Sequence, residues 1–286
     1  MNLPTSHRVR ARGLGFGVLE WGQPRADRPS IVVFHGWLDQ AMAWHRVARA
    51  LVDQGRHVIA WDHRGHGTSD HGAPSSGYHF AEYIADADAL FDALKLDGAV
   101  LVGHSMGGTM AGMFAGLRPQ RVSAAVLVDG LGPPATADAD AVDQLVAFLD
   151  AQRRPPAHRA LGSLDDAQVR IQRVNPGLPD DLARALAQRS TRSEGLGTVS
   201  WSWDARHRSR SAIAYDRDRH LLVLARICAP VALVYGEDGW YPKLDDLGAR
   251  EAAIPTVVSR HNLPCGHAVH LEQPERLAEI IDRAGA

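Results

Sequence analysis

Residues 98–108 read GAVLVGHSMGG, a short apolar run that ends in a serine between glycines. The run predicts a strand buried on both faces, and GTMAGMFAGL (108–117) predicts a helix directly after it. Gly103, Ser105 and Gly107 match G-x-S-x-G in the strand–turn–helix context that this motif requires. Small flanking residues let the backbone pass through a sharp turn, and the serine Oγ then projects at the carboxyl end of the sheet. Ser105 is therefore the predicted nucleophile, and a serine in an ordinary turn is the alternative.

Other short apolar runs along the chain predict further strands. They are SIVVFHG (30–36), HVIAWD (57–62), VSAAVLVDG (122–130), VALVYG (231–236) and TVVSRHNLP (256–264). Helical patterns lie between and after them, at 78–96 and 273–284, and 7–22 has the pattern of an antiparallel hairpin. Alternating strands and helices predict an α/β fold with a mostly parallel central sheet flanked by helices.

The alternation stops between residues 133 and 225, where helix-like segments alternate with proline-rich breaks and no strand pattern is evident. We therefore expect a core domain built from 1–132 and 226–286, with 133–225 inserted as a helical cap. Inside the insertion, 200–220 carries two tryptophans and five arginines. A solvated basic helix face, with its arginines paired to nearby aspartates, is favoured there over a wall of the substrate pocket.

The overall composition excludes several classes of function. A formal net charge of -2 over 286 residues predicts no attraction to nucleic acid or to an anionic membrane surface. The two cysteines do not form a disulfide framework or a CxxC pair, and no apolar run reaches the ~20 residues of a membrane span, so a cytoplasmic protein is expected. No cofactor or metal is expected either. The three histidines in DHRGHGTSDHG (62–72) lack the spacing of a metal site.

A nucleophilic serine needs a base, and His267 is the best candidate among the 15 histidines. It lies on the loop between the last predicted strand and the last predicted helix. His270, three residues later, is the competing candidate, with packing at the helix start as its alternative role. We favour His267.

The base in turn needs a carboxylate to orient it, and the chain order serine, acid, histidine places that acid between Ser105 and His267. Asp238 is favoured, because it follows the penultimate strand beside the loop that carries His267. Asp129, at the end of the preceding strand, is the alternative acid, and Glu237 is a weaker third.

A tetrahedral intermediate also needs two donors for its oxyanion. Met106 follows the nucleophile, and Trp37 lies in FHGW (34–37), directly after the first buried strand. Their backbone N–H groups are the predicted oxyanion hole. Their side chains are then free to line an acyl pocket or to pack in the core.

With these residues in place, the chain resembles the α/β-hydrolase superfamily over nearly its whole length outside the insertion. HGWLD (35–39) is similar to the oxyanion loop of that superfamily, GHSMGG (103–108) to its nucleophile elbow, and CGHAVHLEQPE (265–275) to its catalytic-histidine segment. Together these segments look most like the serine hydrolase-like branch. DHRGHGTSD (62–70) is similar to a loop that the superfamily uses structurally.

One segment departs from the pattern of the superfamily. The resemblance implies a G-E-x-D-x-x-x-P segment, but GEDGWYP (236–242) is one residue shorter. Counting from Gly236 puts Gly239 at the position of the acid, whereas counting back from Pro242 gives Asp238. Some members carry the acid after the preceding strand, and Asp129 therefore remains open.

These residues predict a serine hydrolase that cleaves small or medium carboxylic esters through an acyl-enzyme. Superfamily members with aspartate as the nucleophile form alkyl-enzyme esters instead, and Ser105 argues against that chemistry. A lactonase, a carbon–carbon bond hydrolase and a cofactor-free perhydrolase use the same triad. A ligand-binding receptor without turnover is the alternative outside catalysis. The partner is a small ester-like molecule in the leading hypothesis, and the sequence does not indicate an oligomeric state.

Overall fold

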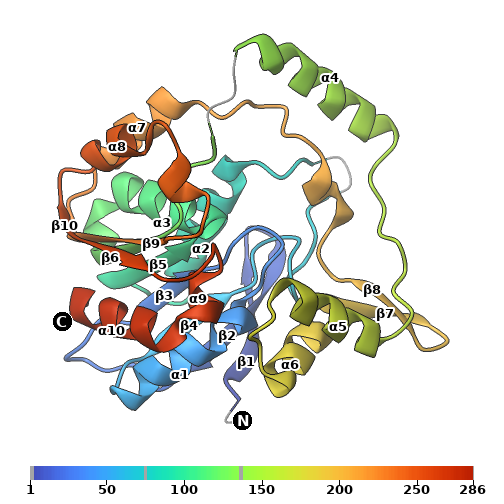
Figure 1. Cartoon of the computed structure of the whole chain (residues 1–286), viewed down its shortest axis with the longest axis horizontal. Helices are drawn as coiled ribbons and strands as arrows, with labels where there is room; N and C mark the ends of the chain where they lie inside the picture. Colours follow the sequence, from blue (N-terminus) through green and yellow to red (C-terminus); the bar gives the residue numbers. More distant parts are fainter. Residues whose placement is uncertain (1–2, 74–75, 135–137, 286) are drawn as a thin grey trace.

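The computed structural model describes residues 3–73, 76–134 and 138–285. Residues 1–2, 74–75, 135–137 and 286, which belong to the predicted core and insertion, lie outside the described residues. The predicted α/β architecture is confirmed: one eight-stranded sheet lies between two layers of helices (Figure 1). The strand order in this sheet is β1-β2-β4-β3-β5-β6-β9-β10.

The strands form where the apolar runs predict them. They are β1 (Thr5–Ala11), β2 (Leu14–Trp21), β3 (Ile31–Phe34), β4 (Val58–Trp61), β5 (Ala99–His104), β6 (Val122–Val128), β9 (Val231–Gly236) and β10 (Val257–Leu263). The β1–β2 hairpin is antiparallel and joins β4 in antiparallel register, whereas β4, β3, β5, β6, β9 and β10 are parallel. Residues in β3, β4, β5 and β9 are buried throughout, as a parallel sheet covered on both faces requires.

Two hydrophobic clusters fix the helices to opposite faces of the sheet. One face packs against α2 (Phe80–Ala93) and α3 (Met106–Leu117), and the other packs against α1 (His45–Asp53) and α10 (Pro274–Ala284). The short helices α8 (Leu247–Ala252) and α9 (Val269–Glu272) complete the core. None of the helices in the described ranges combines the length and the apolar content that crossing a bilayer requires.

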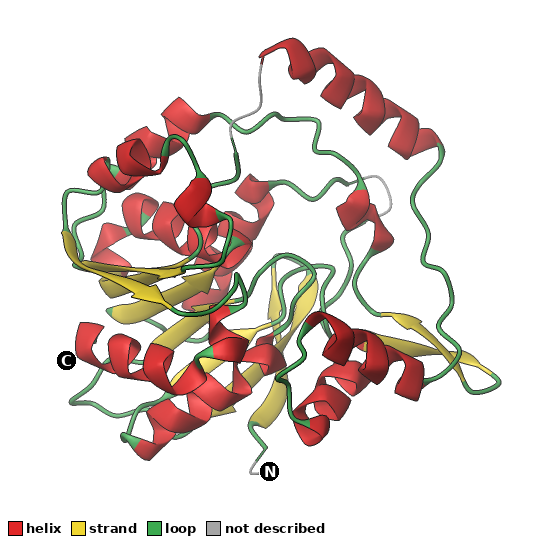
Figure 2. Cartoon of the chain, in the orientation of Figure 1, coloured by secondary structure: helices red, strands yellow, loops and turns green. Residues whose placement is uncertain are grey.

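Between β6 and β9 the chain leaves the main sheet. This stretch contains α4 (Asp138–Arg153), α5 (Leu164–Val174), α6 (Asp180–Ser190), β7 (Thr191–Gly195), β8 (Thr198–Trp201) and α7 (Arg217–Leu224). In Figure 2, α4 lies apart from the sheet, whereas α5 and α6 lie beside the β7–β8 hairpin. The hairpin was not predicted. β7 is polar and mostly exposed, and β8 is only four residues long, so the hairpin lacks the apolar run that marks the core strands.

The segment 200–220 is not the basic helix face that the sequence suggested. It ends β8, forms a single 3₁₀ turn at Ala205–Arg208 and enters α7. The predicted pairing of its arginines with nearby aspartates does occur: Arg206 contacts Asp204, Arg217 contacts Asp218, and Arg219 contacts Asp216.

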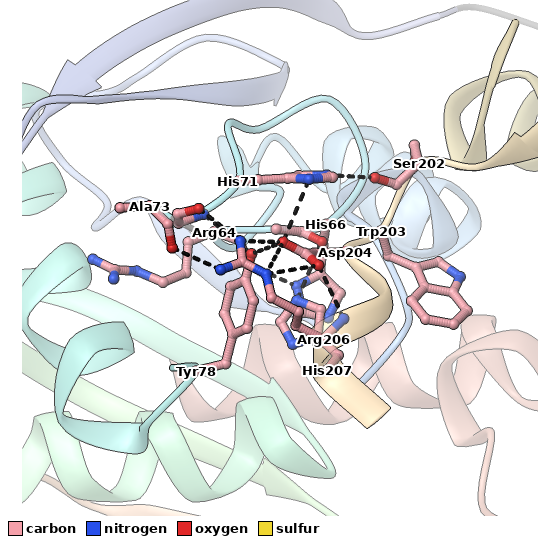
Figure 3. Close-up of polar contacts among 12 residues, drawn as sticks. Arg64, His66, His71, Ala73, Tyr78, Ser202, Trp203, Asp204, Arg206 and His207 are labelled. Atoms are coloured by element: carbon pink, nitrogen blue, oxygen red, sulfur yellow. Dashed lines mark hydrogen bonds and ion pairs between the residues drawn. The ribbon is translucent and has the colours of Figure 1, made fainter. Parts of the chain in front are cut away.

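Asp204 joins this segment to the loop that follows β4 (Figure 3). Its carboxylate accepts hydrogen bonds from the Tyr78 hydroxyl at 2.7 Å and from Arg206 at 2.6 Å, and its backbone N–H donates to Gly65 O at 2.7 Å. Arg206 also donates to the carbonyl oxygens of Gly72 and Ala73. This buried carboxylate is therefore one of the points that fix the insertion to the core; the pair between Arg189 and buried Asp62 is another.

Burial alone would raise the pKa of Asp204, but hydrogen bonds from Arg206 and Tyr78 outweigh it and lower the pKa from 3.8 to about 2. We expect Asp204→Asn to reduce the free energy of unfolding by about 2 kcal/mol at pH 7. Because the pKa is lower in the folded state, this contribution is complete above pH ~5 and is lost as the pH falls toward 2. Urea unfolding of both proteins between pH 7 and pH 3 measures the difference.

The matched control for this prediction is Asp218→Asn, because Asp218 is exposed and paired only at the surface. We expect that variant to lie within about 0.5 kcal/mol of wild type at each pH. Equal stability losses for the two variants would contradict the role of Asp204.

Candidate active site

Ser105 lies on the turn between β5 and α3 in a strained backbone conformation, with φ of 56° and ψ of -118°. The glycines around it are required by close backbone contacts. A Cβ on Gly103 would lie 2.1 Å from Gly107 O, and a Cβ on Gly107 would lie 2.0 Å from Phe34 O. Only glycine fits at either position, and the serine is thereby fixed at the carboxyl end of β5.

His267 pairs with Asp129. The distance from His267 Nδ1 to Asp129 Oδ2 is 3.0 Å, and Asp129 is fully buried directly after β6. Asp129 Oδ1 also accepts the backbone N–H of Gly236 at 3.2 Å. Burial raises the pKa of Asp129, and the hydrogen bond from His267 opposes that rise. The carboxylate therefore pairs with Nδ1 of His267, which leaves Nε2 as the ring nitrogen that can accept a proton.

The structure does not bring Asp238, the favoured acid, to His267. Asp238 and Glu237 are exposed, and neither has a hydrogen bond to His267 in the part of the chain that the structure describes. The place beside His267 is taken by Asp129, whose Oδ2 lies 3.0 Å from His267 Nδ1 and 2.9 Å from where a Cβ on Gly239 would stand. The carboxylate of Asp129 therefore occupies the space that a side chain at position 239 would enter.

His104 lies beside the candidate site, although the sequence did not single it out. It precedes Ser105, it is buried, and its Nε2 lies 2.7 Å from the backbone oxygen of His267. The rings of His104 and His267 are 4.6 Å apart, so the histidine loop lies against the end of β5. The Ser105 hydroxyl itself makes no hydrogen bond within the described residues, and contacts of this kind often tighten only when substrate binds.

Trp37 and Met106 occupy the positions expected of oxyanion donors. Neither backbone N–H has a hydrogen-bond partner among the described residues. Two buried histidines hold the Trp37 loop: His35 Nε2 accepts the N–H of His63 at 2.9 Å, and His66 Nε2 accepts the N–H of Leu38 at 3.3 Å. The loop is thus fixed on both sides of Trp37, and its free amide is available to an anion.

The contacts of His63 and His66 are those of structural residues, in agreement with the interpretation of 62–72 as a structural loop. Both rings are buried, and burial lowers both pKa values well below their usual range. His270, the competing base, is also buried. Its ring stacks on Trp44 and its Nε2 lies 3.3 Å from Asp39, so it is not paired with Asp129.

A cavity of about 530 Å³ adjoins this site. Trp37, Met106 and Thr109 line it from the core, and Phe148 and Tyr215 line it from the insertion. Most of its wall is apolar. It therefore brings a space for an apolar ligand group next to the two free amides.

Comparisons with known proteins agree with the α/β fold. The family model described as alpha/beta hydrolase fold matches residues 29–274. A serine hydrolase-like protein of Danio rerio is 29% identical over 271 residues, which cover 91% of this chain and 82% of the relative. One of Mus musculus is 30% identical over 289 residues, covering 91% and 89%. The solved thioesterase domain from the curacin biosynthetic pathway superposes with a TM-score of 0.88 at 31% identity, covering 98% of this chain and 99% of that domain.

Proposed function

Because the chain belongs to the α/β-hydrolase fold family, we propose that it is a serine hydrolase that cleaves small or medium carboxylic esters through an acyl-enzyme. The observation that carries this proposal is the 3.0 Å contact between His267 Nδ1 and Asp129 Oδ2, beside a serine on a strained strand–helix turn. In this proposal Ser105 is the nucleophile, His267 the base and Asp129 the acid that orients it.

Each proposed residue has a defined step. His267 Nε2 accepts the proton of Ser105 as Oγ attacks the ester carbonyl, and Asp129 stabilises the imidazolium that forms. The Trp37 and Met106 amides bind the oxyanion. The intermediate then collapses, His267 returns the proton to the leaving alcohol, and an acyl-Ser105 ester remains. Water, deprotonated by His267, releases the carboxylic acid and restores the serine.

The cavity supports the proposed substrate class. An apolar space of about 530 Å³ suits an acyl chain of medium length better than a highly charged group. We further propose that residues 133–225 act as a cap, since Phe148 and Tyr215 contribute to the cavity wall. Variation in this cap would then set substrate preference without changing the triad.

A second substrate class is favoured by one observation. The structure with a TM-score of 0.88 is a thioesterase domain, and acyl thioesters react by the same attack on a carbonyl carbon. The leaving group would be a thiol instead of an alcohol. Acyl thioesters therefore belong in the same substrate panel as esters.

The test combines turnover with covalent labelling. We expect the protein to hydrolyse p-nitrophenyl esters with kcat/KM rising from acetate to a medium-length chain, and to be labelled by a fluorophosphonate. Mass spectrometry of the digested adduct is expected to find the label on Ser105. Acyl-N-acetylcysteamine thioesters of the same chain lengths form the second arm, and heat-denatured protein is the control for both.

Several outcomes would redirect the proposal. Label on Ser105 with no turnover of esters or thioesters, but with turnover of lactones or carbon–carbon substrates, would keep the triad and replace the substrate class. No label and no turnover in any arm would favour a ligand-binding protein that retains the fold.

A further inference from the structure

Three potential metal ligands meet behind the candidate active site. Asp39 follows the Trp37 loop, His104 ends β5, and His270 lies in α9. One ligand atom from each lies within 4.8 Å of the others, and the searched, described residues contain no second group of this kind. The three come from distant parts of the chain, so no spacing in the sequence could have indicated them.

The polar atoms of this group are buried, and two of its ring nitrogens lack a partner. His104 and His270 are 5% and 2% exposed. His270 Nε2 faces Asp39 Oδ2 at 3.3 Å, whereas His104 Nδ1 and His270 Nδ1 have no hydrogen-bond partner in the described chain. An unsatisfied buried polar atom is costly, so the free His104 Nδ1 beside a buried Asp39–His270 pair indicates a missing partner.

His104 is prepared to act as a ligand. Its Nε2 lies 2.7 Å from the backbone oxygen of His267, and a carbonyl can only accept, so Nε2 carries the proton. Its Nδ1 therefore presents a lone pair toward the group. Burial lowers the pKa of His104 well below its usual range and keeps the ring neutral. Donation of the second ring N–H to a carbonyl is the usual arrangement around a metal-bound histidine.

We propose that Asp39, His104 and His270 bind a divalent transition-metal ion of the Zn²⁺ class. Two imidazole nitrogens and one carboxylate are ligands that such an ion prefers, with a fourth position left to water. Ligand atoms around a tetrahedral zinc, bound at about 2.0–2.1 Å, lie about 3.3 Å apart. The distance from His270 Nε2 to Asp39 Oδ2 is already 3.3 Å, and the ligand atoms of all three residues lie within 4.8 Å of one another, so binding an ion requires the His104 ring to move inward.

The site is held in place and is accessible. The His270 ring stacks on Trp44 with centroids 4.9 Å apart, which fixes its plane, and the Asp39 side chain retains 23% exposure, which gives an ion a way in. The ion takes no part in acyl transfer. It contacts the catalytic loop indirectly, because the other nitrogen of its ligand His104 holds the backbone oxygen of His267.

The test is calorimetric titration of the chelator-treated protein with Zn²⁺, with Co²⁺ absorption bands as a second readout. A Cys228→Ser background removes the exposed free thiol, which is itself a zinc ligand. We expect one Zn²⁺ per chain. Asp39→Asn and His270→Gln should each weaken binding by at least about 100-fold. Each variant is checked for a native circular dichroism spectrum and thermal transition without metal, and zinc should raise the Tm of the Cys228→Ser parent but not that of Asp39→Asn or His270→Gln.

Two further variants make the result decisive. His261→Gln removes a histidine outside the group and should bind zinc like wild type, and His267→Gln should also retain binding. Loss of binding in His267→Gln, with Asp39→Asn unaffected, would move the ion to the catalytic histidine and overturn the proposal. So would the absence of any stoichiometric Zn²⁺ or Co²⁺ binding, which is what a simple Asp39–His270 ion pair predicts.

Discussion

Asp129→Asn is expected to lower kcat for ester hydrolysis by about 10⁴-fold, with a much smaller change in KM. The asparagine amide can donate to His267 Nδ1 and thereby hold the ring in the tautomer that carries a proton on Nε2. That tautomer cannot accept the proton of Ser105. The asparagine oxygen still accepts the N–H of Gly236, as Asp129 Oδ1 does at 3.2 Å, so the fold should be retained. The kcat from steady-state kinetics and the rate of fluorophosphonate labelling should both fall.

Asp238→Asn is the matched control for this prediction. Asp238 is exposed and lies on the loop after β9, so its replacement should leave kcat within about twofold of wild type. A loss of about 10⁴-fold in Asp238→Asn, with Asp129→Asn near wild type, would return the role of the acid to Asp238. In each variant an NH2 group replaces one carboxylate oxygen, so the side-chain volume hardly changes. The comparison therefore reports the loss of charge and the change of histidine tautomer.

Ser105→Ala is expected to lower kcat by about 10⁶-fold. Without Oγ no acyl-enzyme forms, and only activation of water in the site remains. Alanine has the same backbone preferences as serine at the strained φ of 56°, so the thermal transition should change little. The burst of p-nitrophenol and the fluorophosphonate label should both disappear.

Ser209→Ala controls for loss of a serine from the same cavity. Ser209 lines the cavity from the insertion and lies outside the proposed triad. We expect its label, burst and kcat to match those of wild type. Retained labelling in Ser105→Ala would place the reactive nucleophile elsewhere and would sink the mechanism.

The fold could be predicted from sequence because its signals are local. Apolar runs such as 98–104 must be covered on both faces, and the observed strand β5 (Ala99–His104) lies within that run. The β7–β8 hairpin escaped prediction for the opposite reason. Residues of β7 such as Arg192 and Glu194 contact solvent, and β8 adds only Val199 and Trp201 to a small hydrophobic cluster, so the apolar signal is too short to reveal the hairpin.

The site could be predicted only in part, because some of its partners are determined in three dimensions. Gly103, Ser105 and Gly107 form one local motif, and the structure agrees with it at the level of individual contacts. The partner of His267 was ambiguous, since Asp129 and Asp238 both follow strand ends. What separates them is the space beside Gly239, which depends on the packing of two loops and has no counterpart in a linear pattern.

The position of Asp129 also bears on how related sequences are judged. The Ser105 N–H bonds to Val128 O, and the Asp129 N–H bonds to Val234 O, so the proposed nucleophile and the proposed acid leave adjacent strands of one sheet. The loop after β9 is thereby released from supplying a carboxylate and is free to shorten or drift over evolution. A search for inactive homologues that inspects only the loop after β9 would wrongly class chains with this arrangement as inactive. The identity of the residue that follows β6 has to be checked before a homologue is classed as a pseudoenzyme.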